Sequence, residues 1–300
     1  MILVTGANGF IGKRLVEALI NVGKRVRATD LKFDGDYPKS DLLQVIVGDI
    51  CDPLFVSSIV ENITTTIHLA AIVASPDETL NQNVNVVSTA NLLAAVSEKR
   101  HSRFVYISAA AAKFTHSNAY GRSKRAAEVL VKNQGIEYAI LRIPLVIGAE
   151  GEEYSKFVQY VKKIPFIVPI FGNGKALKRP IYIDDVVYSI LTLIGEKAWP
   201  IRILELASSE LITFDDLVDI ELMTQGTRKW KIHVPKRISL FLARVAEVIF
   251  GDRSPITRDI VNGINENVIF DTEPTLRYLK LSPKSAEVSI SLVKAQNGKH

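Results

Sequence analysis

The stretch "VTGANGFIG" (residues 4–12) decides the fold, because it joins a short apolar run to a helical pattern through Gly6, Gly9 and Gly12. The run before it is "ILVT" (2–5), and the pattern after it is "IGKRLVEALINVG" (11–23). Glycines at such a junction let the backbone turn sharply and approach a pyrophosphate, whose charge the helix start stabilises. The stretch therefore predicts a dinucleotide-binding turn.

The first 145 residues continue the alternation of β-rich runs and helical patterns. The β-rich runs lie at 2–5, 25–30, 44–49, 65–70, 103–108 and 137–143. Such alternation predicts a parallel sheet covered on both faces by helices. We expect an α/β fold with a Rossmann-type doubly wound parallel sheet in residues 1–150.

From about residue 150 the pattern loosens into a mixture of helices and short strands. Residues 151–300 are predicted to form a smaller mixed C-terminal lobe, some of whose segments return to the first domain. The cleft between a nucleotide-binding sheet and such a lobe is the expected substrate site.

Charge and cysteine content exclude several classes of protein. The net charge of +5 is spread along the chain without a basic stripe, so nucleic-acid binding is not expected. Cys51 is the single cysteine, which excludes an intramolecular disulfide and a cysteine-rich metal site. The histidines show no ligand spacing, and no metal is expected.

The chain opens on "MILVTG" without a charged leader, which predicts a cytoplasmic protein. The most apolar later stretch, "ISLFLARVAEVIF" (238–250), is too short to span a bilayer and carries Arg244 and Glu247. A core-facing amphipathic helix is the expected structure, and a membrane-surface anchor is the alternative.

Asp30 ends the second predicted strand, where an acidic residue accepts hydrogen bonds from the adenosine ribose hydroxyls. Its carboxylate would repel a 2'-phosphate, which favours NAD over NADP. Arg27 and Lys32 lie nearby and could compensate for this charge, so NADP stays open.

Tyr120 and Lys124 in "YGRSK" (120–124) are four residues apart, a spacing that places both on one face of a helix. A tyrosine has a pKa of about 10, and a nearby ammonium favours its phenolate form. Tyr120 could then take a proton from a substrate hydroxyl while the oxidised nicotinamide accepts a hydride. The alternative is that "YGRSK" is the exposed start of an ordinary helix.

A series of motifs in the same order resembles the extended short-chain dehydrogenase/reductase family, in its NAD-dependent epimerase/dehydratase branch. They are "TGANGFIG", "GDI" (48–50), "IHLAA" (67–71), "NVVSTANLLAA" (85–95), "YGRSK", "ILRIPLVIG" (140–148) and "IYIDDVV" (181–187). The resemblance implies transient hydride transfer on a nucleoside-diphosphate sugar, with a homodimer as the expected assembly.

The resemblance also implies roles for particular residues. The predicted cofactor-binding residues are Gly6, Gly9, Phe10, Ile11 and Gly12 at the pyrophosphate, Asp30 at the ribose, Asp49 and Ile50 at the adenine, Leu69, Ala70 and Ala71 near the nicotinamide ribose, and Pro144 beside the nicotinamide. Tyr120 is the implied acid/base and Lys124 its partner, which also binds the nicotinamide ribose. Asn85 is grouped with the substrate region as a support of the active-site helix, and Lys178 or Arg179 would meet a substrate diphosphate.

Ala109 departs from the family pattern. The strand ending "FVYIS" is normally followed by a serine or threonine whose hydroxyl holds the substrate oxygen, and alanine has none. Ser108 is the candidate substitute, although neighbouring side chains of a strand point to opposite faces. The sequence thus leaves open whether turnover is attenuated.

Two alternatives to a sugar-nucleotide enzyme remain. A net oxidoreductase acting on a sterol-like or flavonol-like alcohol would use the same Tyr120 and Lys124. The stretches 143–187 and 254–271 also resemble atypical members related to the nucleotide-binding accessory subunit of respiratory complex I, which bind a dinucleotide without evident turnover.

Overall fold

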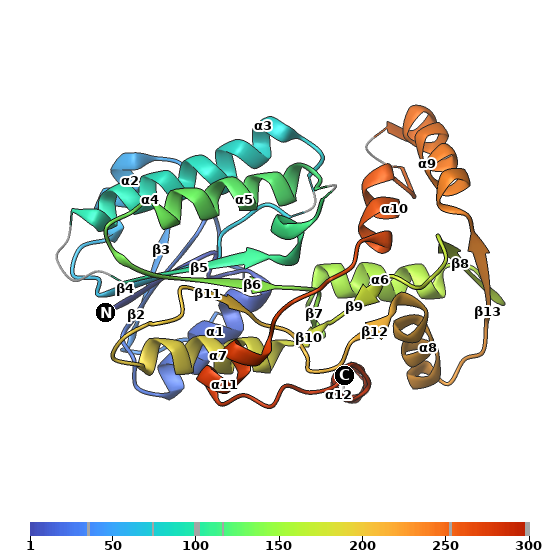
Figure 1. Cartoon of the computed structure of the whole chain (residues 1–300). Coiled ribbons are helices and arrows are strands. Elements are labelled where there is room, and N and C mark those ends of the chain that lie inside the picture. Colours follow the sequence, from blue (N-terminus) through green and yellow to red (C-terminus); the bar gives the residue numbers. More distant parts are fainter. Residues whose placement is uncertain (35–36, 74, 99–102, 116, 252–253, 298–300) are drawn as a thin grey trace. The chain divides into compact units, whose positions relative to one another are not determined.

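A seven-stranded sheet with the order β11-β6-β5-β4-β1-β2-β3 forms the centre of the first part of the computed structural model (Figure 1). All six strand pairings are parallel. The structure describes residues 1–34, 37–73, 75–98, 103–115, 117–251 and 254–297. The strands are β1 (Ile2–Thr5), β2 (Val26–Asp30), β3 (Leu43–Val47), β4 (Thr65–His68), β5 (Arg103–Ala109), β6 (Glu137–Ile143) and β11 (Ile203–Glu205).

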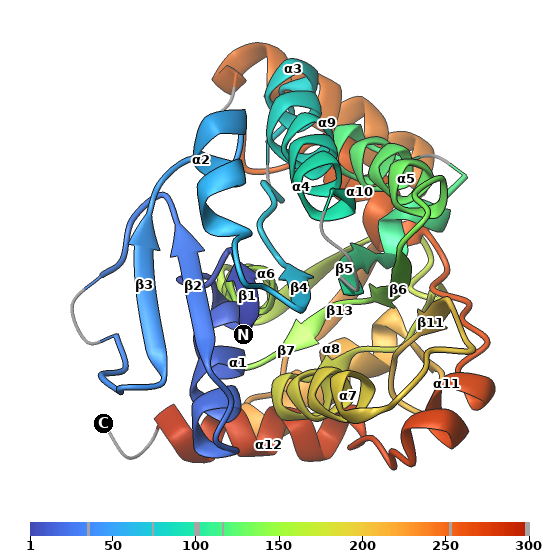
Figure 2. The ribbon, with the colours of Figure 1, turned by 90° about the vertical axis from the view of Figure 1, so that its left-hand side faces the viewer.

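Helices cover both faces of this sheet (Figures 1 and 2). They are α1 (Phe10–Asn21), α2 (Pro53–Ile59), α3 (Glu78–Asn81), α4 (Ser88–Ser97), α5 (Ala119–Lys132), α7 (Ile183–Gly195) and α11 (Glu273–Leu279), with a π-helical segment at Gln82–Val87 and a 3-10 turn at Ala110–Lys113. Helices α2, α4 and α5 lie on one face, and α1 and α7 on the other. The predicted Rossmann-type sheet is confirmed.

Strands buried on both faces explain the near-continuous apolar runs of the sequence. Leu3, Phe104 and Ile140 are fully buried and pack in one core with Leu92 and Val131 of the covering helices. The strand order reverses between β1 and β4, and ligands of such sheets bind at the carboxyl ends of the strands at this point.

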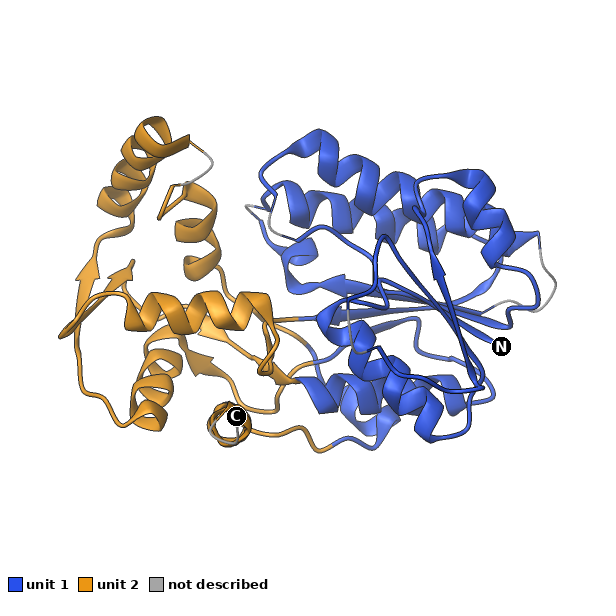
Figure 3. Ribbon diagram, turned by 180° about the vertical axis from the view of Figure 1, so that it is seen from behind, with its two compact units in different colours: residues 1–143, 183–206, 271–281 blue, residues 144–182, 207–270, 282–300 orange. Residues whose placement is uncertain are grey.

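The chain divides into two compact units, coloured in Figure 3. The first unit comprises Met1–Ile143, Ile183–Leu206 and Asp271–Leu281, and the second comprises Pro144–Tyr182, Ala207–Phe270 and Ser282–His300. Two later segments thus return to the first unit and supply α7, β11 and α11.

The second unit combines short strand pairs with helices. Its elements are β7 (Val146–Ile147), α6 (Glu152–Lys162), β8 (Ile167–Phe171), β9 (Leu177–Lys178), β10 (Ile181–Tyr182), β12 (Ile212–Thr213), α8 (Phe214–Gln225), β13 (Trp230–Val234), α9 (Lys236–Phe250), α10 (Arg258–Asn265) and α12 (Ala286–Asn297). Strand β7 pairs with β10 and β8 with β13 in parallel, whereas β9 and β12 are antiparallel. Its core contains Val161, Val168, Ile170, Phe214 and Val218.

Helix α9 corrects one expectation. The stretch 238–250 does form a helix, but all of its large apolar side chains except the half-buried Leu240 are exposed, and its buried residues are Ser239 and Ala243. The core-facing prediction is wrong, because small residues make the contact with the rest of the unit. None of the helices that the structure describes is long and apolar enough to cross a membrane.

Candidate functional site

The glycine turn is held closely against the loop that follows β4. Gly6 has a φ of +67°, and a Cβ added there would lie 2.6 Å from the backbone nitrogen of Ala70. A Cβ on Gly12 would overlap the carbonyl oxygen of Gly6. Glycine is therefore required at both positions, for the left-handed backbone at the first and for space at both.

Helix α1 starts directly from this turn with a bare N-terminus. Gly9 is its N-cap and is exposed, no side chain caps the helix, and its first turn has no acidic residue. The N–H groups of Phe10, Ile11 and Gly12 have no acceptor within the helix, because the first turn of any helix lacks one. This arrangement fits an anionic pyrophosphate.

Asp30 ends β2 beside the turn. Its Oδ2 accepts a hydrogen bond of 2.9 Å from the backbone N–H of Asn8, and its Oδ1 accepts one of 2.8 Å from the N–H of Leu31. Carboxylate oxygens accept further bonds, so Asp30 retains capacity for ribose hydroxyls.

Arg27 and Lys32, the two cations that could offset the negative charge of Asp30, have other partners. The Arg27 side chain donates to Gln44 Oε1 and to the carbonyl oxygens of Ile59 and Glu61. Lys32 lies 3.6 Å from a carboxylate oxygen of Asp34. These contacts leave the acidic character of the Asp30 position in place.

The remaining predicted cofactor residues follow the ends of neighbouring strands. Asp49 and Ile50 come after β3, where the N–H of Gly48 donates to the Asp30 carbonyl at 3.0 Å. Leu69, Ala70 and Ala71 follow β4, and the Leu69 N–H donates to the Thr5 carbonyl at 3.1 Å. Pro144 follows β6 directly. Their contacts with a cofactor stay predictions.

The ends of these strands form the carboxyl edge of the sheet, and a buried chain of hydrogen bonds runs beneath this edge. Thr89 Oγ1 donates to the Asn85 carbonyl at 2.7 Å, so its contact of 3.0 Å with His68 requires a proton on His68 Nε2. His68 Nδ1 then accepts from Thr5 Oγ1 at 2.7 Å. Burial, with the charge of Lys124 adding to it, lowers the pKa of His68 to about 3, which matches this neutral tautomer.

Tyr120 and Lys124 lie on α5, near its start. Asn118 caps the helix by accepting from the Gly121 N–H at 3.0 Å. The Lys124 side chain is buried, and its Nζ lies 4.3 Å from the centroid of the Tyr106 ring, in a cation–π contact. Burial lowers the pKa of Lys124 to about 7, although the charge of Glu128 acts in the opposite direction.

Asn85 ties α5 to the loop after β4 from within the π-helical segment. Its Oδ1 accepts from the Ile72 N–H at 2.8 Å, and its Nδ2 donates to Ser123 Oγ at 2.8 Å. The Asn85 side chain is buried. A supporting role fits this geometry better than direct contact with a substrate.

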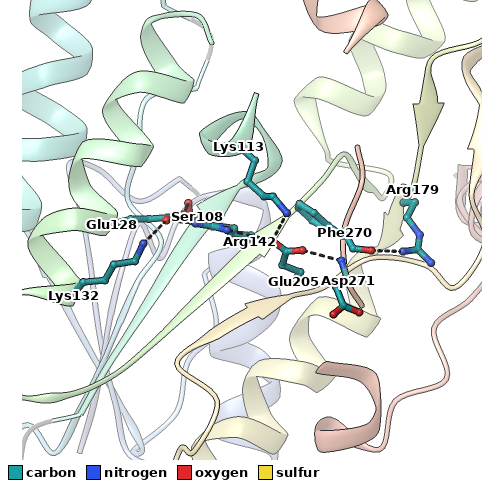
Figure 4. A network of polar contacts seen from close by, with 9 residues as sticks. All are labelled: Ser108, Lys113, Glu128, Lys132, Arg142, Arg179, Glu205, Phe270 and Asp271. Carbon is teal, nitrogen blue, oxygen red and sulfur yellow. Dashed lines mark hydrogen bonds and ion pairs between the residues drawn. The ribbon is translucent and has the colours of Figure 1, made fainter. Parts of the chain in front are cut away.

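Ser108 points toward α5, but its hydroxyl is already hydrogen-bonded to a side chain of that helix. It donates a hydrogen bond of 2.7 Å to Glu128 Oε1, and Arg142 binds both carboxylate oxygens of Glu128 (Figure 4). Arg142 also contacts Glu205, which pairs with Lys113 at 2.6 Å. Ala109 has an extended backbone, so its side chain points to the opposite face of β5 from Ser108.

Lys178 and Arg179 belong to the second unit and bind backbone oxygens there. Lys178 Nζ donates to the carbonyls of Gly263 and Glu266, and burial lowers its pKa to about 8. Arg179 donates to the carbonyls of Phe270 and Ser209. Their role toward a substrate diphosphate stays a prediction.

Tyr106, His68 and the Glu128–Arg142 pair belong to this site but were not predicted as site residues from the sequence. Tyr106 and Ser108 are two residues apart on β5, so the strand period predicts that they share a face, and their contacts with Lys124 and Glu128 show that this face meets α5. Nothing in the local sequence pairs Glu128 with Arg142, because the contact joins a helix to a strand.

The fold and this edge together define a dinucleotide-binding α/β protein with a Tyr–Lys pair. The sequence pattern of the NAD dependent epimerase/dehydratase family matches residues 2–200. The chain belongs to this family.

Relatives of the chain carry different names. The chain is 26% identical over 240 residues to the Arabidopsis thaliana mitochondrial protein "NADH dehydrogenase [ubiquinone] 1 alpha subcomplex subunit 9", covering 77% of this chain and 59% of that one. It is 27% identical to a ceramide reductase of Caulobacter vibrioides, over 64% of this chain and 60% of that one. It is 28% identical to the human dTDP-D-glucose 4,6-dehydratase, over 64% of this chain and 65% of that one. The chain thus spans about three fifths of the length of the first two relatives.

Solved structures share the fold over the whole chain. MoeE5 in complex with UDP-glucuronic acid and NAD superposes with a TM-score of 0.77 at 21% identity, covering 100% of this chain and 99% of that one. The UDP-glucuronic acid 4-epimerase of Bacillus cereus in complex with NAD gives a TM-score of 0.75 at 22% identity, with 99% of each chain covered.

Proposed function

We propose that this chain is an NAD-dependent enzyme that acts on a nucleoside-diphosphate sugar with Tyr120 as its acid/base. One observation carries the proposal: the Tyr–Lys pair and the glycine turn lie at the same edge of one sheet. Lys124 Nζ lies over the Tyr106 ring, the centroid of that ring is 5.6 Å from the centroid of the His68 ring, and His68 is hydrogen-bonded to Thr5, the residue before Gly6. Family membership and the NAD and UDP-sugar complexes of structural neighbours support the same function.

The residues at this edge fit the dinucleotide. The Phe10 and Ile11 N–H groups would bind the pyrophosphate, and Asp30 the adenosine ribose. Because Arg27 binds Gln44 and two backbone carbonyls and Lys32 pairs with Asp34, neither of these two cations is directed to Asp30, and NAD is preferred over NADP. When bound, the oxidised nicotinamide supplies a hydride acceptor.

Lys124 controls the proton chemistry of Tyr120. With its pKa lowered to about 7, the amine changes protonation near neutral pH. In the charged form it favours the phenolate of Tyr120, which can then accept a proton from a substrate hydroxyl. A neutral amine no longer stabilises the phenolate, so we expect activity to depend on Lys124 even though Lys124 itself exchanges no proton with the substrate.

The test compares the full chain with Tyr120→Phe. Small molecules retained by the purified protein are identified by mass spectrometry, and turnover is measured on a panel of nucleoside-diphosphate sugars. Tyr120→Phe should bind NAD like the unchanged protein and lose at least about a hundredfold in turnover, since it removes the general acid/base. The matched control is Tyr138→Phe, because Tyr138 lies near the amino end of β6, away from this edge. Unchanged turnover in Tyr120→Phe would refute the assigned role.

A second candidate is a dinucleotide-binding subunit without turnover. Two observations favour it: Ala109 lacks a hydroxyl while Ser108 is bound to Glu128, and one relative is named as a subunit of NADH dehydrogenase. Retained NAD, no activity on the whole panel and co-purification with a larger assembly would select this candidate. A protein that retains no dinucleotide would contradict both.

A further inference from the structure

Helix α9 presents a continuous apolar face to the outside of the second unit. The face consists of Ile238, Phe241, Leu242, Val245, Val248 and Ile249, and we call it the α9 face. Their spacing of three, four and seven residues places them on one side of a helix. The exposed fractions are 81% for Val248, 67% for Phe241 and 66% for Ile249.

The opposite side of α9 makes the internal contact with small residues. Ser239 and Ala243, one turn apart, are fully buried, and the helix packs against α10. A surface helix normally turns its large apolar residues inward. Helix α9 does the reverse, and exposed apolar patches of this kind mark interaction sites.

Basic residues border the α9 face. Arg237 and Arg244 are exposed and seven residues apart, so both lie along the same margin. The single acid of the helix, Glu247, is bound to Arg258 at 2.7 Å. Within Lys236–Phe250, the helix therefore carries positive charge beside the α9 face, and its one carboxylate is already paired. Arginine stems can lie along apolar surface while the guanidinium reaches a polar layer.

We propose that the α9 face docks flat on a lipid bilayer that carries anionic headgroups. An apolar face beside basic residues is the pattern of helices that lie in the membrane interface. Phe241 and Val245 would enter the boundary of the acyl chains, and Arg237 and Arg244 would bind lipid phosphates. A second copy of the chain fits less well, because two such helices would bring their arginines together and the one acid of each helix, Glu247, is already bound to Arg258.

The experiment measures co-flotation of the full chain with vesicles. Vesicles of phosphatidylcholine mixed with phosphatidylserine should bind the protein, and vesicles of phosphatidylcholine alone should bind it more weakly. The variant Phe241→Ser/Val245→Ser/Ile249→Ser should bind the mixed vesicles at least about tenfold less, because it removes buried apolar area. The variant Arg237→Glu/Arg244→Glu should lose about tenfold on mixed vesicles only.

Controls alter exposed residues elsewhere. Leu54→Ser/Met223→Ser removes two apolar side chains that are 82% and 74% exposed, and Lys24→Glu/Arg25→Glu reverses two charges. Both should bind vesicles like the unchanged chain. Circular dichroism checks folding, and the single variant Val248→Ser replaces the triple variant should that one unfold.

Two results would overturn the proposal. The first is equal binding of the triple variant and the unchanged chain to mixed vesicles, or no binding by either. The second is a dimer in sedimentation velocity that the triple variant abolishes, which would assign the α9 face to a second copy. Neither result depends on turnover, so this experiment tests membrane binding independently of the proposed enzymatic function.

Discussion

The hydroxyl of Ser108 lies 2.7 Å from Oε1 of Glu128, which fixes the end of β5 to the middle of α5. Glu128 is one helical turn after Lys124, which is itself one turn after Tyr120. The carboxylate that holds Ser108 therefore anchors the helix that presents the Tyr–Lys pair. Arg142 on β6 completes the anchor by binding the same carboxylate.

Replacing Ser108 by alanine should affect stability more than chemistry. The variant removes one buried hydrogen bond to a charged group, and we expect the free energy of unfolding to fall by about 2 kcal/mol. Turnover of the folded variant should stay within about threefold of the unchanged protein, since the hydroxyl points to Glu128. Urea unfolding and steady-state kinetics measure the two quantities. A large loss of turnover at unchanged stability would instead assign Ser108 a catalytic role.

Ala109→Ser should preserve or raise activity. The added hydroxyl stands on the opposite face of β5 from Ser108, so Glu128 does not compete for it. The substitution adds one atom, and the free energy of unfolding should change by less than about 1 kcal/mol. Kinetics on the substrate identified from the purified protein provide the measurement. A sharp fall in turnover would show that the alignment of this strand with the family pattern is wrong.

Glu128 should contribute stability that acid removes. Burial alone would raise its pKa, but hydrogen bonds from Arg142 and Ser108, with the charges of Arg142 and Lys132, outweigh burial and hold the pKa below its usual value. A depressed pKa in the folded state gives stability that is complete above the unfolded pKa of about 4.3 and lost as the pH falls through the folded value.

Comparison with Glu128→Gln isolates this contribution. The variant should lose about 2 kcal/mol of unfolding free energy at neutral pH, because Arg142 loses the carboxylate that it binds through two nitrogens and keeps only its contact with Glu205. The difference between the two proteins should shrink below a pH of about 4. Urea unfolding of both proteins at a series of pH values measures this difference in unfolding free energy. A difference that is independent of pH would exclude the charge as the cause.

Gly9→Ala and Gly12→Ala should separate cofactor binding from packing. A Cβ on Gly12 overlaps the Gly6 carbonyl, so that variant should lose about 2 kcal/mol of stability through overpacking. Gly9 has a φ of −71°, which alanine adopts readily, and its added Cβ would lie at the exposed helix start, 3.2 Å from the Gly6 carbonyl oxygen, so that a small shift accommodates it. We expect Gly9→Ala to stay folded and to bind NAD at least about tenfold more weakly, because the Cβ keeps the pyrophosphate from the N–H groups. Calorimetric titration tests this, and unchanged affinity would argue against pyrophosphate binding at the turn.

Local sequence was enough to predict six of the seven strands of the sheet, because each carries its own pattern, but it did not assign β11 (Ile203–Glu205) to this sheet. The predicted run at 137–143 is β6 from Glu137 to Ile143, and the predicted run at 103–108 lies within β5 from Arg103 to Ala109. The positions of Gly6, Asp30 and Tyr120 at strand and helix ends followed from the same patterns. Spacing alone placed Tyr120 and Lys124 on one face of a helix.

The direction of a side chain depends on partners that are distant in sequence, and the tertiary structure decided it. Ser108 turns to Glu128, Arg27 turns to the carbonyls of Ile59 and Glu61, and Lys124 lies over Tyr106. Periodicity gave α9 two distinct sides, but a helical pattern does not say which side meets the protein. Close packing through Ser239 and Ala243 settled that choice and left the large apolar residues outside.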